Sequence, residues 1–503
     1  MRTLSIFAAA CLASACAGPQ QPAGSRPPSI DSHDSTRPTM SSAPLSASDT
    51  ELQRLAGSIV VGGHAYDYVR DLSDAYGPRL TGSALLAAAA RWAVESFRRA
   101  GLEGARIEEF TIPHGWERRE ARARMLSPVE RPIHVSAVGW SSPMPAGGVR
   151  GRVMVLDLED SMRLRESELR GAIVVFSTRA MVPDKRLARL RALKTLAQAG
   201  VAAVLYHLPK PNQGMLAHAM QAREQPIPVP ILDVSLEDGA AIERAAEKGP
   251  VTLELSNPSP LLGPVKVPNV VADIRGSEHP DEIVLVGAHL DAWDFGTGAQ
   301  DNGTGVASVL EAARAIRALS GGARPPKRTL RFALWGGEEQ GLLGSRAYAK
   351  AHAGELDRIV MVLNTDLGSG PPKGWIADGR PDVIQRLSPL AKSWLSGLGA
   401  DTLQTEMSCQ SDHCPFWVEG VPTLNLDVDS THYFEVHHQS GDTLDKISPA
   451  SLASGAAVVA VTALGIANLP ERIAPRLDHA TVVAHAKEGK LFEMLVHDEL
   501  MTE

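Results

Sequence analysis

The chain has 503 residues, of which 44% are hydrophobic, 5% are aromatic and 21% are charged. This length predicts about two or three domains, and the composition excludes a disordered chain, a collagen-like repeat and a disulfide-dense mini-protein. The 50 Lys and Arg against 58 Asp and Glu give a net charge of −8. Nothing therefore indicates a nucleic-acid-binding protein, which usually carries a strongly basic face. Four Cys in so long a chain cannot form a disulfide framework.

The first residues predict an exported protein. After a short positive start, Leu4–Ala15 is apolar but too short to span a bilayer as a helix, and Ala13–Ala15 matches an A-x-A cleavage pattern. Cys16 follows directly, as in a bacterial lipobox, although Ala13 stands where Leu is commonest. We predict a signal peptide over 1–16. The protein is then either a periplasmic or cell-surface lipoprotein anchored at Cys16, or a secreted protein.

The rest of the chain divides into segments of different composition. Residues 17–48 are rich in Pro, Ser, Gly and Gln without apolar periodicity, which is typical of a disordered linker. No later stretch is predicted to cross a membrane. The remaining segments are 49–120, with a helix and an extended run; 121–262, a small β-rich domain; 263–470, in which strands and helices alternate; and 471–503, a polar C-terminal tail.

Apolar runs and turn residues predict the elements within these segments. In chain order they are a helix over 87–97 that ends before Gly101, an extended run over 106–112, strands over 152–156 and 172–176, a helix over 185–199, strands over 201–206, 283–286, 330–335 and 359–363, and a short helix near 491–496. The alternation over 263–470 predicts an α/β fold with a mixed, mainly parallel sheet flanked by helices.

Chemically active side chains follow three of the predicted strands. Because open α/β sheets bind ligands beyond the carboxyl ends of their strands, we expect these side chains to share one crevice. They are His289 and Asp291 after the strand over 283–286, Glu338 and Glu339 after that over 330–335, and Asp366 after that over 359–363, with His437 and His438 further along the chain.

Imidazoles and carboxylates are ligands that Zn²⁺ prefers in catalytic sites. Two metal ions need more anionic charge than one, ideally with a bridging carboxylate, and Asp301 in its Gly-rich turn suits that role. A structural zinc site would more often use Cys, and the chain has no C-x-x-C pair. It also lacks H-E-x-x-H and G-x-S-x-G motifs, and the glycines of 296–305 lack the Gly-Lys-Ser/Thr ending of a P-loop.

These motifs resemble those of the M28 family of co-catalytic zinc peptidases, over about 50–120 and 263–470. The resemblance implies a zinc exopeptidase fold, with 49–120 and 263–470 as two parts of one peptidase domain and 121–262 as an inserted protease-associated domain. Asp294, Gln300 and the pair His437–His438 are similar to the carboxypeptidase Q-like branch. The motifs are His289-Leu290-Asp291, the run from Gly298 to Gly303, the run from Glu338 to Leu342, Asp366, and His438 four residues before Asp442.

The resemblance also implies a role for each site residue. It implies two Zn²⁺ per chain, which hold a hydroxide between them and polarise the scissile carbonyl. In family members the peptide after the bridging Asp is cis. His437 stands where some relatives have a Tyr that steadies the tetrahedral intermediate, and it either donates the same hydrogen bond or only packs. The implied roles are His289 and Asp366 as ligands of one zinc, Glu339 and His438 as ligands of the other, Asp301 as the bridge, Asp291 as the acceptor of the other N–H of His289, and Glu338 as general base and acid.

The implied function is an exported two-zinc exopeptidase that acts on N-terminal residues of peptides or on dipeptides. Two other functions stay open: a single-zinc enzyme like glutaminyl cyclase, and a non-catalytic receptor on a peptidase scaffold. A peptide is the expected partner, with no nucleic acid, membrane contact only through Cys16, and a homodimer left open. Cys409 and Cys414 flank Ser411–His413 in what resembles a substrate-pocket loop, and both a disulfide and two free thiols are open there.

Overall fold

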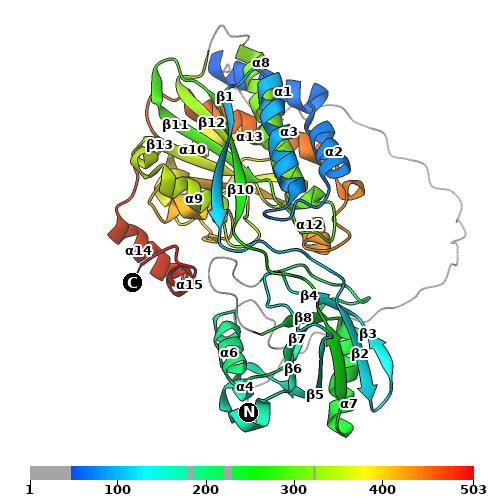
Figure 1. Cartoon of the computed structure of the whole chain (residues 1–503). Coiled ribbons are helices and arrows are strands. Elements are labelled where there is room, and N and C mark those ends of the chain that lie inside the picture. The colour runs from blue at the N-terminus through cyan, green and yellow to red at the C-terminus, as the bar shows by residue number, and fades with distance from the viewer. Residues whose placement is uncertain (1–46, 179–185, 220–228, 321–324, 503) are drawn as a thin grey trace, which may run out of the picture. The chain divides into compact units, whose positions relative to one another are not determined.

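The computed structural model describes residues 47–178, 186–219, 229–320 and 325–502 (Figure 1). The predicted signal peptide over 1–16, with Cys16, and nearly all of the predicted linker over 17–48 lie outside the described residues. Residues from Ser46 onward form one unit, and this unit contains two sheets.

The first sheet contains the strands whose ends carry the candidate site. Among the described residues it has eight strands, in the spatial order β1 (Glu103–Ile112), β10 (Val265–Ile274), β12 (Arg328–Trp335), β11 (His279–His289), β13 (Ile359–Asn364), β16 (Thr423–Val428), β14 (Pro372–Ile376) and β15 (Thr402–Gln404).

The centre of the first sheet is parallel. β12 pairs with β11, β11 with β13 and β13 with β16 in parallel, whereas β1 with β10, β10 with β12 and β14 with β16 are antiparallel. Every residue of β13 is buried, as in strands whose two faces are covered by helices. The predicted mixed, mainly parallel α/β sheet is therefore confirmed.

Helices precede, separate and follow these strands. The longer ones are α1 (Ala47–Gly62), α2 (Ala65–Tyr76), α3 (Ala84–Arg99), α8 (Thr304–Ser320), α9 (Leu343–Ala351), α10 (Pro381–Leu395), α13 (Pro449–Ala467) and α14 (His479–Glu488). The shorter ones are α11 (Cys414–Trp417), α12 (Thr431–Val436), α15 (Phe492–His497), and the short helical segments η3 (Ala299–Gly303), η4 (Ala353–Arg358), η5 (Ser396–Leu398) and η6 (Leu444–Lys446).

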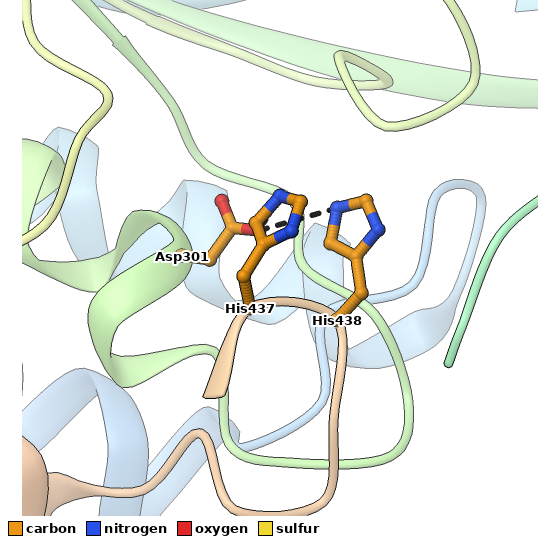
Figure 2. A group of neighbouring side chains, drawn as sticks. All are labelled: Asp301, His437 and His438. Carbon is orange, nitrogen blue, oxygen red and sulfur yellow. Dashed lines mark ion pairs between the residues drawn. The ribbon is translucent and has the colours of Figure 1, made fainter. Parts of the chain in front are cut away.

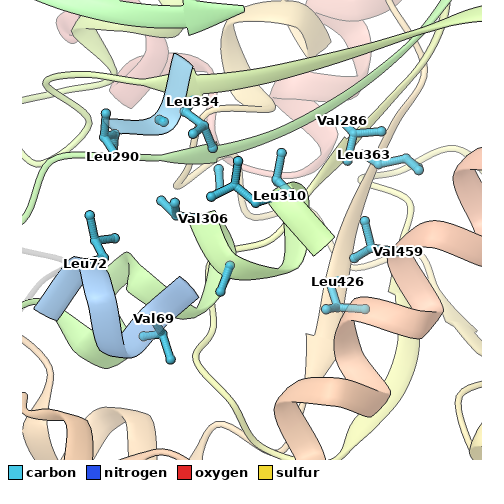
Figure 3. Close-up of a cluster of buried hydrophobic side chains, with 14 of the residues drawn as sticks. Val69, Leu72, Val286, Leu290, Val306, Leu310, Leu334, Leu363, Leu426 and Val459 are labelled. Atoms are coloured by element: carbon cyan, nitrogen blue, oxygen red, sulfur yellow. The ribbon is translucent and has the colours of Figure 1, made fainter. Parts of the chain in front are cut away.

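The core lies between the first sheet and helices α2, α8 and α13 (Figure 3). Val306 and Leu310 of α8 are both buried next to strand residues such as Val286 and Leu334. Burying a side chain of this kind contributes roughly 1.5–3 kcal/mol. This packing holds α8, and with it the turn η3 at its start, against the strand ends.

Helix α13 departs from the sequence analysis. We predicted no membrane-spanning segment after the N-terminus, but α13 has the length and composition of one, the single such helix among the described residues. In this fold 78% of its most apolar window is buried, and Val459 and Leu452 belong to the core. α13 is apolar because it packs against several elements at once, as the core helix of a globular fold does.

The second sheet is formed by residues between β1 and β10. Since these two strands are antiparallel neighbours, the chain leaves the first sheet after Ile112 and returns to it at Val265. Its eight described strands follow the order β3 (Arg131–Ile133), β2 (Arg122–Ser127), β9 (Thr252–Ser256), β5 (Val149–Leu156), β6 (Ile173–Phe176), β7 (Ala203–His207), β8 (Ile231–Val234) and β4 (Val135–Ala137), with helices α4 (Leu158–Arg163), α5 (Glu166–Leu169), α6 (Arg186–Gln198) and α7 (Leu236–Lys248).

The C-terminal tail contains more structure than predicted. The sequence predicts one short helix near 491–496, whereas the structure has both α14 and α15. Val482 of α14 and Leu495 of α15 are buried in one cluster with Trp417. The tail therefore packs on α11, which lies far from it in the chain, so local spacing does not reveal this contact.

Candidate metal centre

Three neighbouring parallel strands of the first sheet end at the same level. His289, the last residue of β11, pairs with Trp335 at the end of β12, and Gly287 of β11 pairs with Asn364 at the end of β13. Side chains that lie at or just beyond these positions therefore emerge at one edge of the sheet. His289, Glu339 and Asp366 all lie there.

His289 forms a first cluster with Asp301 and Asp366. Its Nε2 atom lies 3.0 Å from Oδ1 of Asp366 and 3.2 Å from Oδ1 of Asp301. Its Nδ1 atom donates to the backbone oxygen of Asp291 at 3.1 Å, with the carboxylate of Asp291 farther away at 3.7 Å. The hydrogen bond that orients the ring thus goes to the backbone of Asp291, where the sequence analysis expected the carboxylate.

His438 forms a second cluster with Glu339 and Asp301. Its Nε2 atom lies 3.0 Å from Oε2 of Glu339 and 3.4 Å from Oδ2 of Asp301. Figure 2 shows the imidazole of His437 beside it, with Nε2 at 3.6 Å from the same Asp301 oxygen and the two rings stacked at 3.6 Å. Both histidines therefore reach Asp301, and of the two it is His438 that also pairs with Glu339.

Asp301 lies between the two clusters, and neighbouring backbone groups hold it there. Its Oδ1 faces His289 and its Oδ2 faces His438. The N–H of Asp301 donates to one oxygen of Asp442 at 3.1 Å, and the N–H of Gln300 donates to the other at 2.6 Å. The peptide bond that follows Asp301 is cis, as the family resemblance implies.

Asp291 links the end of β11 to the turn after β12. It is fully buried. Its carboxylate accepts the N–H of Glu338 at 3.1 Å and the hydroxyl of Thr81 at 2.9 Å, with the N–H of Glu339 at 3.4 Å. Asp291 therefore holds the backbone that carries both glutamates, in addition to its backbone contact with His289.

Burial and mutual charge set the electrostatics of the two clusters. Burial alone would lower the pKa of His289, but Asp366, Asp291 and Asp301 outweigh it and raise that pKa well above its usual value. Likewise Glu339 and Asp301 raise the pKa of His438 to about 10 against burial. The two imidazolium groups hold the pKa of Asp301 well below its usual value, although burial acts in the opposite direction. A metal ion competes with these protons, because it binds imidazole and carboxylate in deprotonated form.

Burial makes the carboxyl groups of Glu338 and Glu339 weaker acids than that of an exposed glutamate. Burial raises the pKa of Glu338 well above its usual value, the charge of His289 opposes this, and Asp366 and Glu339 raise it further. Burial, and then the charge of Asp301, raise the pKa of Glu339 to about 7. A carboxyl group with a raised pKa is suited to exchange protons near neutral pH.

His437 differs from His438 in charge. Burial and the positive charge of His438 lower the pKa of His437 to about 3. Its ring packs at 4.9 Å from that of Tyr433, and 31% of its side chain is exposed. At neutral pH one nitrogen of a neutral imidazole donates a hydrogen bond and the other accepts one.

Arg79 is a site residue that the sequence analysis missed. It is fully buried, and its guanidinium donates to the backbone oxygens of Gly77, Leu290, Thr297 and Gly298 at 2.7–2.9 Å. Gly298 has a φ of 61°, and a Cβ there would lie 2.9 Å from Nη2 of Arg79, so the position requires Gly. No local pattern signals a contact over more than 200 residues; the single hint is an arginine among small and apolar neighbours.

The loop over Ser411–His413 differs from the substrate-pocket loop that it resembled. Its residues are buried, and Ser411 donates its hydroxyl to Oδ2 of Asp366 at 2.6 Å. A disulfide between Cys409 and Cys414 closes the loop. The loop therefore supports Asp366, and the cavity beside the two clusters is lined instead by Trp293, Gly296, Gly298, Asp301, Glu339, His438, Gln439 and Asp442.

Comparisons with known proteins agree with this geometry. The model of "Peptidase family M28" matches residues 269–463. Carboxypeptidase Q of Mus musculus is 32% identical over 81% of this chain and 87% of its own length, and that of Homo sapiens is 31% identical over 81% and 86%. Aminopeptidase YwaD of Bacillus subtilis is 27% identical over 76% of this chain and 80% of its own length.

Solved structures lead to the same family. A peptidase M28 precursor from Shewanella amazonensis is 30% identical, covers 86% of this chain and 99% of its own, and superposes with a TM-score of 0.77. A zinc aminopeptidase from Bacillus subtilis is 25% identical, with a TM-score of 0.64 and coverage of 79% and 94%. Together with the strand-end cluster of histidines and carboxylates, these similarities show that the chain belongs to peptidase family M28.

Proposed function

We propose that the chain is an exported exopeptidase that uses two zinc ions to hydrolyse the bond after an N-terminal residue, in peptides or in dipeptides. That the chain is a zinc exopeptidase follows from its family and from its similarity to a zinc aminopeptidase. The number of ions, the roles of single residues and export are our proposals. The observation that carries the two-ion site is the position of Asp301, whose two oxygens face two different histidines.

The side chains of both clusters fit a zinc ion. Imidazole nitrogens and carboxylate oxygens are its usual protein ligands. Candidate ligand atoms of His289, Asp301 and Asp366 all lie within 4.8 Å of one another. In the second cluster, Oε1 of Glu339 is buried and has no hydrogen-bond partner among the described residues. A buried carboxylate oxygen without a partner is costly, and a cation held by Glu339, His438 and Asp301 would satisfy it.

Zinc held at these positions would supply Lewis-acid polarisation of the scissile carbonyl and would make a nucleophilic water more acidic. The remaining chemistry belongs to the chain's own residues. Glu338 takes a proton from the attacking water and gives it to the leaving amine as the C–N bond breaks. His437, neutral at pH 7, donates a hydrogen bond to the oxygen on which negative charge develops. Asp291 keeps the backbone of Glu338 in place.

Two alternative functions fit the site less well than this proposal. A single-zinc enzyme like glutaminyl cyclase would need one ligand cluster, and the pairing of His438 with both Glu339 and Asp301 speaks against it. A non-catalytic receptor on this scaffold would not need a proton-exchanging carboxyl, and Glu338 is present and buried near His289.

Metal analysis and peptide digestion test the proposed function together. We expect two zinc ions per purified chain, and mass spectrometry of a digested peptide library should show release of N-terminal residues from free but not from blocked N-termini. One zinc without peptide hydrolysis would favour the cyclase, and hydrolysis of blocked peptides at internal bonds would contradict exopeptidase action.

The location and the inserted segment complete the proposal. We propose that the chain is exported, with Cys16 as a lipid anchor, and that 121–262 is a protease-associated domain inserted between the peptidase segments 49–120 and 263–470, with 471–503 as a tail. Replacing Cys16→Ser should move the protein from the membrane fraction to the soluble exported fraction. If both forms partition alike, Cys16 is not an anchor.

A further inference from the structure

The segment that follows β7 of the second sheet contacts the turn that carries His438. The N–H of Ala217 donates to the backbone oxygen of His438 at 2.7 Å, and Nζ of Lys210 lies 3.5 Å from the backbone oxygen of Phe434 on α12. His438 has a φ of 59°, a left-handed conformation that is uncommon for a residue other than Gly. Such a conformation persists where its surroundings support it, and Ala217 provides part of that support.

His218 connects Ala217 to the body of the second sheet. Its Nε2 atom lies 2.8 Å from Oδ1 of Asp233, a fully buried residue of β8. Its ring stacks on that of Tyr206 in β7, with 5.8 Å between centroids and 12° between planes. Its backbone oxygen accepts the N–H of Gly139 at 2.9 Å. Ala217 therefore precedes a residue that three separate contacts hold to the second sheet.

The ring of His438 is contacted from another direction by Trp293. The two rings meet edge to face with centroids 5.9 Å apart, and Trp293 is buried. A Cβ on Gly139 would lie 3.2 Å from two ring atoms of Trp293 and 3.3 Å from the backbone oxygen of His218, so Gly139 packs closely against both. The contacts form a closed path from the backbone of His438 through Ala217, His218, Gly139 and Trp293 back to its ring.

We propose that the second sheet positions His438, with His218 as the positioning residue that acts through the N–H of Ala217. The proposal rests on the proposed function, in which His438 holds a zinc ion. It assigns the inserted segment a part in building the metal centre, beyond any effect on access to it. Outer contacts of this kind commonly change metal affinity by about 10–100-fold when they are removed.

His207 provides a matched control within the same sheet. It lies at the end of β7, is buried, and has each ring nitrogen 2.8 Å from an acceptor. Both acceptors, Oε1 of Glu243 and the backbone oxygen of Leu236, belong to α7. Removing the His207 ring therefore disrupts a comparable histidine contact of the second sheet without touching the path to His438.

The test uses the full chain with His218→Ala, His218→Gln or His207→Ala. The measurements are zinc affinity by chelator competition, the visible spectrum after reconstitution with Co²⁺, which reports ligand geometry, and the melting temperature. We expect His218→Ala to bind one of its zinc ions at least about 10-fold more weakly and to change the cobalt spectrum. His218→Gln, which keeps a donor toward Asp233, should have the zinc affinity and the cobalt spectrum of the unaltered protein. His207→Ala should lower the melting temperature and leave the zinc affinity and the cobalt spectrum unchanged.

Two results would overturn the proposal in different ways. A His218→Ala protein with unchanged zinc affinity and cobalt spectrum but a lowered melting temperature would show that His218 is merely structural. An unaltered protein that binds no zinc and hydrolyses no peptide would overturn the proposed function as well. If His218→Ala does not fold, Asp233→Ala, which removes the acceptor of the His218 ring, replaces it in the same measurements, with the same weakening expected and the same unchanged result contradicting the proposal.

Discussion

Each of the two sheets contains a set of parallel strands with buried apolar residues, yet the two sets end differently. β7 of the second sheet ends at His207, just as β11 of the first ends at His289. The two nitrogens of His207 have one acceptor each, whereas Nε2 of His289 is shared by two carboxylates. Parallel topology provides an edge where side chains gather. A metal site forms at such an edge only where the carboxylates outnumber the hydrogen-bond donors that the neighbouring side chains offer them.

The largest effect should come from the residue that makes this edge reactive. Glu338→Gln keeps the shape of the side chain and removes its basicity, and general acid–base groups contribute about 10²–10⁴-fold. We expect peptide hydrolysis to fall by at least that range in a steady-state assay while metal analysis still finds zinc at the occupancy of the unaltered protein. Loss of zinc from this variant would show that the roles of Glu338 and Glu339 are reversed.

The two adjacent histidines separate metal binding from catalysis. His438→Ala removes a group that pairs with both Glu339 and Asp301, so we expect loss of one zinc ion. His437→Ala should keep both ions and lose about 10²–10³-fold in kcat, as expected for a lost hydrogen-bond donor to a developing oxyanion. Metal content and kcat of the two purified variants check this, and the opposite pattern would exchange the two roles.

A smaller loss of activity or metal affinity is expected for a residue that contacts Asp291 and not the metal ligands themselves. Thr81→Val deletes the hydroxyl that donates to Asp291 while keeping a side chain of similar shape. Because Asp291 also holds the N–H groups of both glutamates, we expect about a 10-fold loss of activity or metal affinity. Ser345→Ala is the comparison variant, because it also removes one buried hydroxyl that donates to a carboxylate, that of Asp412. Unchanged kinetics in Thr81→Val would mean that the backbone contacts alone hold Asp291.

Truncation of a buried leucine should cost the two sheets similar amounts of stability. Leu205 of β7 and Leu285 of β11 are both fully buried. Truncation to Ala should destabilise either sheet by about 2–5 kcal/mol, measured by denaturant unfolding. We expect the hydrolysis rate per folded molecule to stay within a few-fold of the unaltered protein in both. A selective loss of rate in Leu205→Ala would show that the second sheet affects catalysis even through its core.

Much of this architecture could be predicted from local sequence patterns. The apolar runs at 283–286, 330–335 and 359–363 lie within β11, β12 and β13, and the residues that follow them meet at one edge. These predictions succeed because a buried parallel strand leaves a continuous apolar signature and because its direction fixes which end faces the ligand.

Contacts between distant segments could not be predicted from such patterns. The buried position of Arg79 depends on loops more than 200 residues away, and the contact from Ala217 to His438 joins the segment after β7 to the turn after α12. Helix α14 went unnoticed because its buried face is completed by Trp417 and Leu495, which belong to other elements. In each case the stabilising partner is defined by the tertiary fold, so neither periodicity nor spacing along the chain reveals it.

The carbonyl contacts of Arg79 bear on the order in which the molecule assembles. The oxygens of Leu290 and Gly298 are each bound by a side chain that is synthesised more than 200 residues earlier. Contacts of such long sequence separation require closure of a large loop, which delays them relative to local structure. We therefore expect the helices and hairpins of each segment to form first and the loop around Asp301 to gain its final shape late. A chain still emerging from the ribosome would then contain the peptidase residues without a working arrangement of them.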